Sequence, residues 1–312
     1  DPLPEGGVYV LELSSYQIDL TQSLDCDVAV LLNITPDHLD RYESFDAYAA
    51  SKARLFEMQS PENSAVVVGE DPASQRVART VSNRLVPTAF GDWIQEGVCI
   101  DDTHTWRPFR ENEVRANALS VDDGEYGQQS WWPALQGPHN AQNALAAMAA
   151  AYALDRDLKL WPEERMIGEA LRTYPGLPHR MERIREKDGV LFVNDSKATN
   201  PTATAPALAA FPSIRWIVGG QAKTDNLDEC APHFGHVRSA YTIGEAGELF
   251  ARLLEPHMPV TNCETLGNAL NHAAKDSQAG DTVLLSPACA SFDQFRDFEQ
   301  RGERFKELVG AL

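Results

Sequence analysis

A short apolar run over residues 28–34 constrains the fold of this chain more than any other feature. The run is dominated by valine, leucine and isoleucine, which is typical of a strand buried on both faces of a parallel sheet. Pro36 ends it, because proline cannot donate a hydrogen bond to the sheet. Asp37, His38 and Asp40 follow directly, and open α/β sheets bind ligands beyond the carboxyl ends of their strands. The sequence therefore predicts an α/β fold with a polar site at this strand end.

The helix predicted after Ser44 carries Lys52 on its apolar face. That face consists of Phe45, Tyr48, Leu55 and Phe56, which recur at helical spacing. A lysine that points inward is costly unless a neighbouring group needs its charge or its nitrogen. Two interpretations stay open from the residues alone: a lysine whose stem covers apolar surface while its ammonium stays in water, or a catalytic lysine beside the polar strand end.

Residues 8–13 predict another strand, with Glu12 near its end and a helix opening at Ser14. A glutamate in a buried strand has to be ion-paired, protonated or bound to a cation. Because the carboxyl ends of parallel neighbours meet at one edge of a sheet, we expect Glu12 to lie near His38. A glutamate held by a salt bridge at the sheet edge is the alternative.

The charge and the cysteines limit the partners of the chain. The formal net charge of −19 over 312 residues disfavours nucleic acid and anionic membranes as partners, while a small anionic substrate needs only a few local cations. The five cysteines are far apart and lack metal-ligand spacing, so we predict free thiols in a reducing compartment. No signal peptide or membrane span is apparent, since the most apolar helix, 143–154, is too short. We expect a cytoplasmic protein without membrane insertion.

A turn-rich segment at residues 174–178 predicts the boundary between domains over 1–176 and 177–312. The first domain should contain a further strand at 65–68, a helix at 72–81 and short strands at 86–90 and 97–121, in part antiparallel. An alanine-rich helix then carries Asn140 and Asn143 on its first turn, where these amides cap the helix or bind a nucleotide.

The second domain alternates strands and helices in the pattern of a doubly wound, Rossmann-like sheet. A hairpin is predicted around Asp188-Gly189, with strands at 214–218, 237–243 and 281–285 and helices near 201–211, 245–254, 264–276 and 292–309. Lys197 and Lys223 lie in polar loops after two strands, as ordinary loop lysines or as ligands of a carboxylate or phosphate. Ser291 and Gln294 fit a capping box for the last helix.

Taken together, five segments of the chain resemble the Mur ligase family. They are residues 11–17, 33–42, 176–180, 194–200 and 284–295 with 299–302, which run from one end of the chain to the other. The resemblance implies an ATP-dependent amide ligase with three domains, of which this chain would hold most of the central ATP-binding domain and the whole C-terminal, amino-acid-binding domain. The first domain and the G-x-x-x-x-G-K-[ST] phosphate loop are expected upstream of residue 1, so we expect the fragment alone to be inactive.

The resemblance also assigns roles to individual residues. Glu12, His38 and Lys52 would hold Mg²⁺, with Lys52 carbamylated, because a carbamate offers the oxygen ligands that Mg²⁺ prefers. The nucleotide would lie near Asn140, Asn143, Arg180 and Asp195, with Lys197 between it and an acyl phosphate. The amino acid would be held by Thr199, Lys223, Ser291, Phe292 and Phe298. His179 and Arg301 match family positions tied to activity.

The matching segments point to the branch of the family that joins D-glutamate to UDP-N-acetylmuramoyl-L-alanine. The implied substrates are therefore these two compounds and ATP. Two alternatives stay open: a sister ligase of the Mur or folylpolyglutamate type that takes another amino acid, and a fragment that only binds nucleotide or D-glutamate. Residues upstream of Asp1 would discriminate between these classes most directly.

Overall fold

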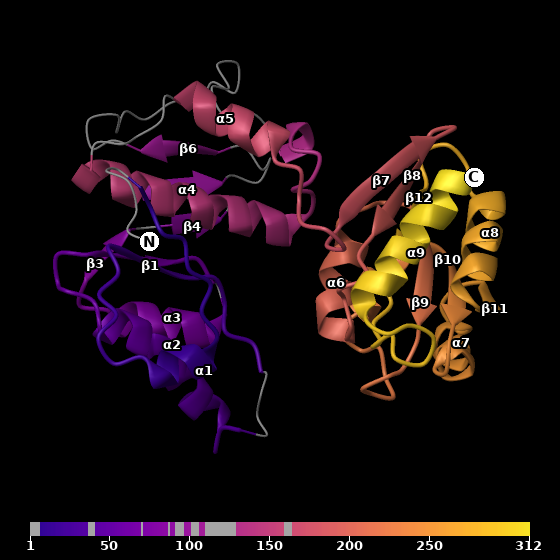
Figure 1. Cartoon of the computed structure of the whole chain (residues 1–312), viewed down its shortest axis with the longest axis horizontal. Helices are drawn as coiled ribbons and strands as arrows, with labels where there is room; N and C mark the ends of the chain where they lie inside the picture. The colour runs from indigo at the N-terminus through magenta and orange to yellow at the C-terminus, as the bar shows by residue number, and fades with distance from the viewer. Residues whose placement is uncertain are drawn as a thin grey trace. The chain divides into compact units, whose positions relative to one another are not determined.

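The computed structural model describes residues 7–36, 41–69, 71–86, 88–90, 97–100, 106–109, 129–158 and 164–312. The chain divides into two compact units, each described by itself below (Figure 1). The first comprises Asp1–Gln128 and Gln142–Glu169, and the second comprises Gln129–Ala141 and Ala170–Leu312. The division crosses helix α4 (Pro138–Leu158) near its beginning.

The first unit is built around a parallel sheet of β1 (Val28–Leu31), β2 (Ser64–Val67) and β3 (Arg84–Val86), in that order. The unit also contains helices α1 (Ser15–Leu20), α2 (Phe45–Glu57) and α3 (Pro72–Thr80). Leu31, Tyr48, Phe56 and Val67 share one buried core, because the apolar face of α2 packs on the sheet. The helix capped by Ser44 is confirmed, and the strand predicted over 28–34 is present but ends at Leu31.

A second small sheet contains β4 (Thr88–Phe90), β5 (Gly97–Ile100) and β6 (Trp106–Phe109). Strand β5 runs antiparallel to β6, as expected, but parallel to β4. The single strand predicted over 86–90 is wrong, because Val86 pairs with β2 whereas Thr88 pairs with β5. The predicted strand residues 110–121 lie outside the described residues. Helix α5 (Glu164–Thr173) completes the elements before the linker.

The strand predicted over residues 8–13 is not formed. Residues 7–14 belong to no helix or strand, and the side chain of Val10 is 92% exposed. A β-branched run becomes a strand only where a neighbouring strand accepts its hydrogen bonds and another layer covers its apolar side. The helix predicted to open after Ser14 is present, with a capping box between Ser14 and Gln17.

The second unit contains one six-stranded sheet in the order β11-β10-β9-β12-β8-β7. The strands are β7 (Glu182–Lys187), β8 (Val190–Asn194), β9 (Ile214–Gly219), β10 (Val237–Ile243), β11 (Val260–Glu264) and β12 (Thr282–Leu285). All neighbours are parallel except the hairpin β7–β8. The doubly wound fold, the hairpin and three of the parallel strands were predicted correctly. Strand β11 was missed, because it is an edge strand of mixed polarity with largely exposed side chains.

Helices cover both faces of this sheet, as Figure 1 shows. They are α6 (Pro201–Ala209) and α7 (Gly247–Leu254) on one face, and α8 (Leu266–Asp276) and α9 (Phe298–Ala311) on the other. Neighbouring residues of β9 alternate between the two cores: Trp216 joins Phe250 of α7, and Ile217 joins Phe305 of α9. Among the described residues, no helix combines the length and apolar character needed to cross a bilayer.

The last helix begins later than predicted. Helix α9 starts at Phe298 with Asp297 as its N-cap, whose carboxylate accepts the Gln300 N–H at 2.7 Å. The capping box assigned to Ser291 and Gln294 is therefore wrong. The segment before the helix instead crosses the carboxyl ends of β10 and β11, because Asp293 accepts the Glu245 N–H at 2.9 Å and the Gln294 side chain donates to the Glu264 carbonyl at 2.7 Å.

Substituting Phe305 tests the observed register of α9. Phe305 is fully buried, so Phe305→Ala leaves a cavity and should lower the free energy of unfolding by about 3–5 kcal/mol. Phe292→Ala is the matched control, because that ring is 67% exposed and its loss should change stability by less than about 0.5 kcal/mol. Urea unfolding of both variants measures the difference. If both variants lost the same free energy of unfolding, α9 would pack in a different register.

Candidate active site

The candidate site lies at the carboxyl edge of the six-stranded sheet, where the loops after β8, β9 and β12 meet. Two of these loops are hydrogen-bonded to each other, since Gln221 and Ala290 exchange backbone hydrogen bonds of 2.9 Å in both directions. Gly220 has φ of 131°, and an added Cβ would lie 2.4 Å from the Ala290 oxygen. Glycine is required there because the two loops approach each other so closely.

Asp195 is the buried acid of this edge. Its carboxylate accepts hydrogen bonds from the Ser286 hydroxyl at 2.7 Å and from the Met181 N–H at 3.2 Å. Burial raises the pKa of Asp195 to about 7, although these two hydrogen bonds and the charge of Arg180 act in the opposite direction. The side chain therefore connects the end of β8 to the end of β12. Its predicted place beside a nucleotide stays a prediction.

His179 lies beneath the same edge in an uncommon backbone conformation, with φ of 62°. Its ring nitrogen Nδ1 is 3.0 Å from Asn194 Nδ2, and its N–H donates to Glu182 at 3.0 Å. Gly302 of α9 provides the space, because an added Cβ would lie 2.1 Å from His179 Nδ1. A side chain at position 302 would therefore displace this histidine.

Lys197 and Phe298 lie next to His179. The Lys197 N–H donates to the His179 carbonyl at 3.0 Å, and the Lys197 ammonium is 5.3 Å from the centre of the Phe298 ring. The His179 ring meets the Phe298 ring edge-on, with centroids 6.0 Å apart. Lys197 is exposed, so its charge remains accessible to a ligand while the aromatic ring partly orients it. Three residues from three separate segments are thus brought together.

Arg301, on the first turn of α9, is buried under the loops after β8 and β12. Its guanidinium donates to Ser196 and to the carbonyl oxygens of Cys289 and Ala290. Burial lowers the pKa of Arg301 to about 10, which still leaves the group charged at neutral pH.

The remaining residues predicted to hold the amino acid are distributed over the loops of this edge. Thr199 is half-buried, Ser291 is buried, and Lys223 and Phe292 are exposed. The bridge between Gln221 and Ala290 draws the loops of Lys223 and Ser291 together. The Phe292 N–H was expected at a helix N-terminus, which is wrong because α9 begins at Phe298.

The residues predicted to bind metal lie in the first unit. Lys52 is half-buried on α2, with its ammonium 5.2 Å from the centre of the Tyr48 ring, and Glu12 is exposed. His38 lies outside the described residues. Within the described ranges, no group of three or more His, Cys, Asp or Glu side chains is arranged to hold a metal ion. The exposed carboxylate of Glu12 is an oxygen ligand of the kind that Mg²⁺ prefers, and the carbamylation of Lys52 stays a prediction.

A hydrogen-bonded cluster fixes α2 against α1 beside Lys52. Asp19 accepts the Tyr42 hydroxyl at 2.8 Å and the Ser51 hydroxyl at 2.7 Å. These hydrogen bonds help to lower the pKa of Asp19 against the opposing effect of its burial, so its carboxylate remains charged at neutral pH. Because Ser51 precedes Lys52, the cluster also fixes the part of the helix that carries this lysine.

The predicted nucleotide residues lie on α4 and after the linker. The Asn140 side chain donates to the Gln136 carbonyl at 3.0 Å, while Asn143 and Arg180 are exposed. His139, which was not predicted as a site residue, has a buried Nδ1 without a hydrogen-bond partner in the described part of the chain. Burial lowers the pKa of His139 to about 4, so the ring is neutral at pH 7.

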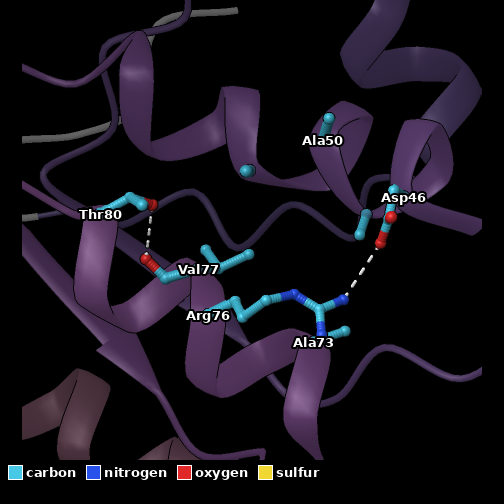
Figure 2. A pocket seen from close by; sticks show the side chains of 8 residues that line it. Asp46, Ala50, Ala73, Arg76, Val77 and Thr80 are labelled. Atoms are coloured by element: carbon cyan, nitrogen blue, oxygen red, sulfur yellow. Dashed lines mark hydrogen bonds and ion pairs between the residues drawn. The ribbon is translucent and has the colours of Figure 1, made fainter.

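Figure 2 shows a groove between α2 and α3 that contains no predicted site residue. It is lined by Asp46, Ala49, Ala50, Ala53, Ala73, Arg76, Val77 and Thr80. Arg76 and Asp46 form an exposed ion pair of 3.1 Å across it. Small side chains and a solvated ion pair explain this groove without a ligand.

Several buried polar residues that shape the carboxyl edge were not predicted. They are Asn194, Ser196, Thr204 and Ser286, while the half-buried Glu182 accepts a hydrogen bond from Asn194 and Gly302 leaves the space for His179. Asn194 and Ser286 directly follow predicted strands, and Ser196 lies in the loop after one of them, which is the one signal that the sequence offered. The others contact the site from elements distant in sequence.

Two family profiles match the chain. The Mur ligase middle domain matches residues 4–151, and the Mur ligase, glutamate ligase domain matches residues 179–289. Among curated proteins, the chain is 55% identical over 312 residues to the UDP-N-acetylmuramoylalanine–D-glutamate ligase of Novosphingobium aromaticivorans, and 50% identical over 313 residues to that of Zymomonas mobilis. These alignments cover the whole chain, which spans 63% of the length of each relative.

Solved structures share the fold at lower identity. One is a bifunctional folylpolyglutamate synthase/dihydrofolate synthase from Yersinia pestis, complexed with AMPPNP and a Mn ion. It is 19% identical with a TM-score of 0.58, and the alignment covers 92% of this chain and 62% of that chain. Another is a UDP-N-acetylmuramoylalanyl-D-glutamyl-2,6-diaminopimelate–D-alanyl-D-alanyl ligase from Acinetobacter baumannii. It is 18% identical with a TM-score of 0.59, and the alignment covers 95% of this chain and 60% of that chain.

The buried carboxyl of Asp195 predicts a specific dependence of stability on pH. Its folded pKa lies above the unfolded value, so the folded state retains a proton that the unfolded state releases between about pH 4 and pH 7. Stability should therefore fall as pH rises through this range, on the order of a few kcal/mol at about 1.4 kcal/mol per pKa unit. In urea unfolding at several pH values, Asp195→Asn should weaken the dependence of the unfolding free energy on pH. Ser286→Ala should strengthen it, because it removes a hydrogen bond that lowers the pKa of Asp195. Parallel profiles for the wild type and Asp195→Asn would contradict this assignment.

Proposed function

This chain belongs to the Mur ligase family, and on that premise we propose that it forms the nucleotide-binding and amino-acid-binding parts of a D-glutamate ligase. The whole enzyme would add D-glutamate to UDP-N-acetylmuramoyl-L-alanine with ATP, in the synthesis of peptidoglycan precursors. The observation that carries the proposal is the 55% identity, along the entire chain, with the D-glutamate ligase of Novosphingobium aromaticivorans. The chain corresponds to 63% of that relative, so the activity is proposed for the whole protein.

The proposed reaction has two steps. The carboxylate of UDP-N-acetylmuramoyl-L-alanine attacks the γ-phosphate of ATP, which forms an acyl phosphate and releases ADP. The amine of D-glutamate then attacks the acyl carbon, and the tetrahedral intermediate collapses with loss of phosphate. Both steps develop negative charge, so cationic side chains at fixed positions accelerate them. Lys197 is exposed beside the Phe298 ring, which suits a charge placed between nucleotide and acyl phosphate.

The loops of the carboxyl edge would hold D-glutamate. Thr199 and Lys223 would bind one carboxylate, and Ser291 with the Phe292 N–H would bind the other. Phe298 would line the same pocket. The hydrogen bonds between Gln221 and Ala290 support this arrangement, since they join the loops that carry Lys223 and Ser291. Because each carboxylate of D-glutamate would be bound by a different loop, the choice of amino acid would depend on the distance between the loops.

The remaining proposed ligands are those of the nucleotide and of the metal ion. Asn140, Asn143, Arg180 and Asp195 would lie around ATP, and Glu12, His38 and carbamylated Lys52 would hold Mg²⁺. The ion would offset negative charge on the phosphates when bound. His179 would help to hold the backbone of Lys197 in place, because its carbonyl accepts the Lys197 N–H at 3.0 Å. A cytoplasmic location fits the free thiols of Cys26, Cys230, Cys263 and Cys289.

An assay of phosphate release by the whole protein tests the proposed function. Release should require ATP, UDP-N-acetylmuramoyl-L-alanine and D-glutamate together, and omission of any one should abolish it. L-Glutamate, L-lysine and meso-diaminopimelate serve as comparison amino acids, and each should give a kcat/KM at least about a hundredfold lower. Comparable release with one of these amino acids would instead assign the protein to a sister ligase.

Lys223 and Ser291 provide a sharper test of the amino-acid site. Lys223→Ala in the whole protein should raise the KM for D-glutamate by about tenfold or more, because a buried carboxylate loses its cation, while the KM for ATP should change little. Ser291→Ala should act in the same direction more mildly, since it removes one hydrogen bond of about 1–3 kcal/mol. Lys275→Ala on the exposed side of α8 is the matched control. Equal KM changes for D-glutamate and ATP would argue against this site.

A further inference from the structure

Arg301 is a charged side chain placed where water cannot solvate it. Arg301 is 1% exposed and lies on the first turn of α9, below the carboxyl edge of the sheet. No carboxylate lies within ion-pair distance of its guanidinium among the residues that the structure describes. Burying a charge without a counter-ion is costly, so its hydrogen bonds have to compensate for the lost hydration.

Those hydrogen bonds reach two different loops. Toward the loop after β8, Nε donates to the Ser196 hydroxyl at 2.9 Å and one terminal nitrogen donates to the Ser196 carbonyl at 2.8 Å. Toward the loop after β12, the same terminal nitrogen donates to the Cys289 carbonyl at 3.0 Å and the other to the Ala290 carbonyl at 3.3 Å. The rigid guanidinium thus spans the distance between the two loops.

The surroundings of Arg301 extend this connection. The Ser196 hydroxyl donates to the Phe298 carbonyl at 2.8 Å, which links the loop after β8 to the beginning of α9. Gly220, in the loop after β9, leaves the space that Arg301 occupies, because an added Cβ would lie 3.2 Å from a terminal nitrogen. Three loops of the edge therefore pack around this one side chain.

We propose that Arg301 is a positioning residue that sets the spacing between the loop after β8, residues 195–200, and the loop after β12, residues 286–291. The hydrogen bonds of its guanidinium go to Ser196, Cys289 and Ala290 of these two loops, so it acts through the loops. With the proposed function as premise, the two loops carry Thr199 and Ser291, which would bind different carboxylates of D-glutamate. A fixed loop spacing then selects an amino acid with that separation between its carboxylates.

The chemistry of arginine accounts for the choice of residue. A lysine at position 301 would retain the positive charge but would present a single nitrogen, which cannot donate to both loops with this geometry. A methionine would fill a similar volume without charge or donors, and would leave the carbonyl oxygens of Ser196, Cys289 and Ala290 without these hydrogen bonds. Arg301→Lys is therefore the informative variant, and Arg301→Met is the more severe one.

Arg215 is the matched control for these substitutions. It lies at the amino end of β9 in the same sheet, with Nε 2.9 Å from Asp281 and a terminal nitrogen 3.0 Å from the Ser239 hydroxyl. Arg215→Lys and Arg215→Met remove a comparable arginine network at the edge opposite to the proposed site. Any effect that both pairs of variants share reflects general loss of stability.

The experiment combines amide hydrogen exchange with steady-state kinetics on the whole protein. In Arg301→Lys, the N–H groups of Lys197, Ala198 and Ala290, which are hydrogen-bonded in the two loops, should exchange about tenfold faster or more. The KM for D-glutamate should rise by about tenfold or more, with little change in the KM for ATP. Arg215→Lys should lower the melting temperature without either effect.

The outcomes separate this proposal from the proposed function. Unchanged exchange in both loops of Arg301→Lys, or equal exchange in Arg215→Lys, would overturn the positioning role. Faster exchange with an unchanged ratio of the KM values for D-glutamate and ATP would overturn it as well. Faster exchange in a protein whose wild type does not use D-glutamate would support the positioning of the loops and reject the proposed substrate.

Discussion

The structure of the second unit depends on the insertion of β12 between β8 and β9. Thr282 is in register with Leu191 on one side and with Ile214 on the other, so the last strand of the chain occupies the centre of the sheet. Because all three strands are parallel, their carboxyl ends meet at one edge. The loop after β12 is thereby held between two loops that precede it by many residues. The contacts between the loops after β8, β9 and β12 follow from this arrangement.

The buried polar groups of that edge serve mainly to hold loops in place. Asp195 joins β8 to β12 through Ser286, and Arg301 joins the following loops through carbonyl oxygens. Apolar side chains could fill the same volume at lower cost in desolvation, but they would specify the loop positions less directly. Exposed Lys197 and Lys223 extend from the loops around this buried layer. The edge thus combines buried groups that hold its loops in place with lysine side chains that are exposed to solvent.

The first unit follows a similar plan around α2. Apolar residues of this helix pack on the sheet, while Asp19, Tyr42 and Ser51 connect it to α1 by hydrogen bonds. Lys52 follows Ser51 directly and is half-buried beside Tyr48. A lysine in such a place loses part of its hydration, so a partner for its nitrogen is favoured. The carbamylation proposed above would make this nitrogen part of an oxygen-bearing ligand of Mg²⁺.

The sequence by itself determined the elements and their order. Apolar runs such as 28–34 and 237–243 predicted buried strands, and the alternation of strands with helices predicted a doubly wound sheet, because these signals depend on neighbouring residues. The placement of Lys197, Lys223 and Ser291 in loops after strands was predictable for the same reason. Residues 8–13 and the strand over 86–90 were predicted wrongly, since strand formation requires partners that a local pattern does not reveal.

Only the tertiary structure decided which loops touch and which residues hold them. Ser291 was assigned a capping role from its spacing to Gln294, whereas long-range hydrogen bonds of Asp293 and Gln294 delay the start of α9 to Phe298. Arg301 meets Ser196 across 105 residues of sequence, and Gly302 makes room for His179 across a similar separation. Such contacts depend on strand order and register, which pair segments that carry no local signal of one another.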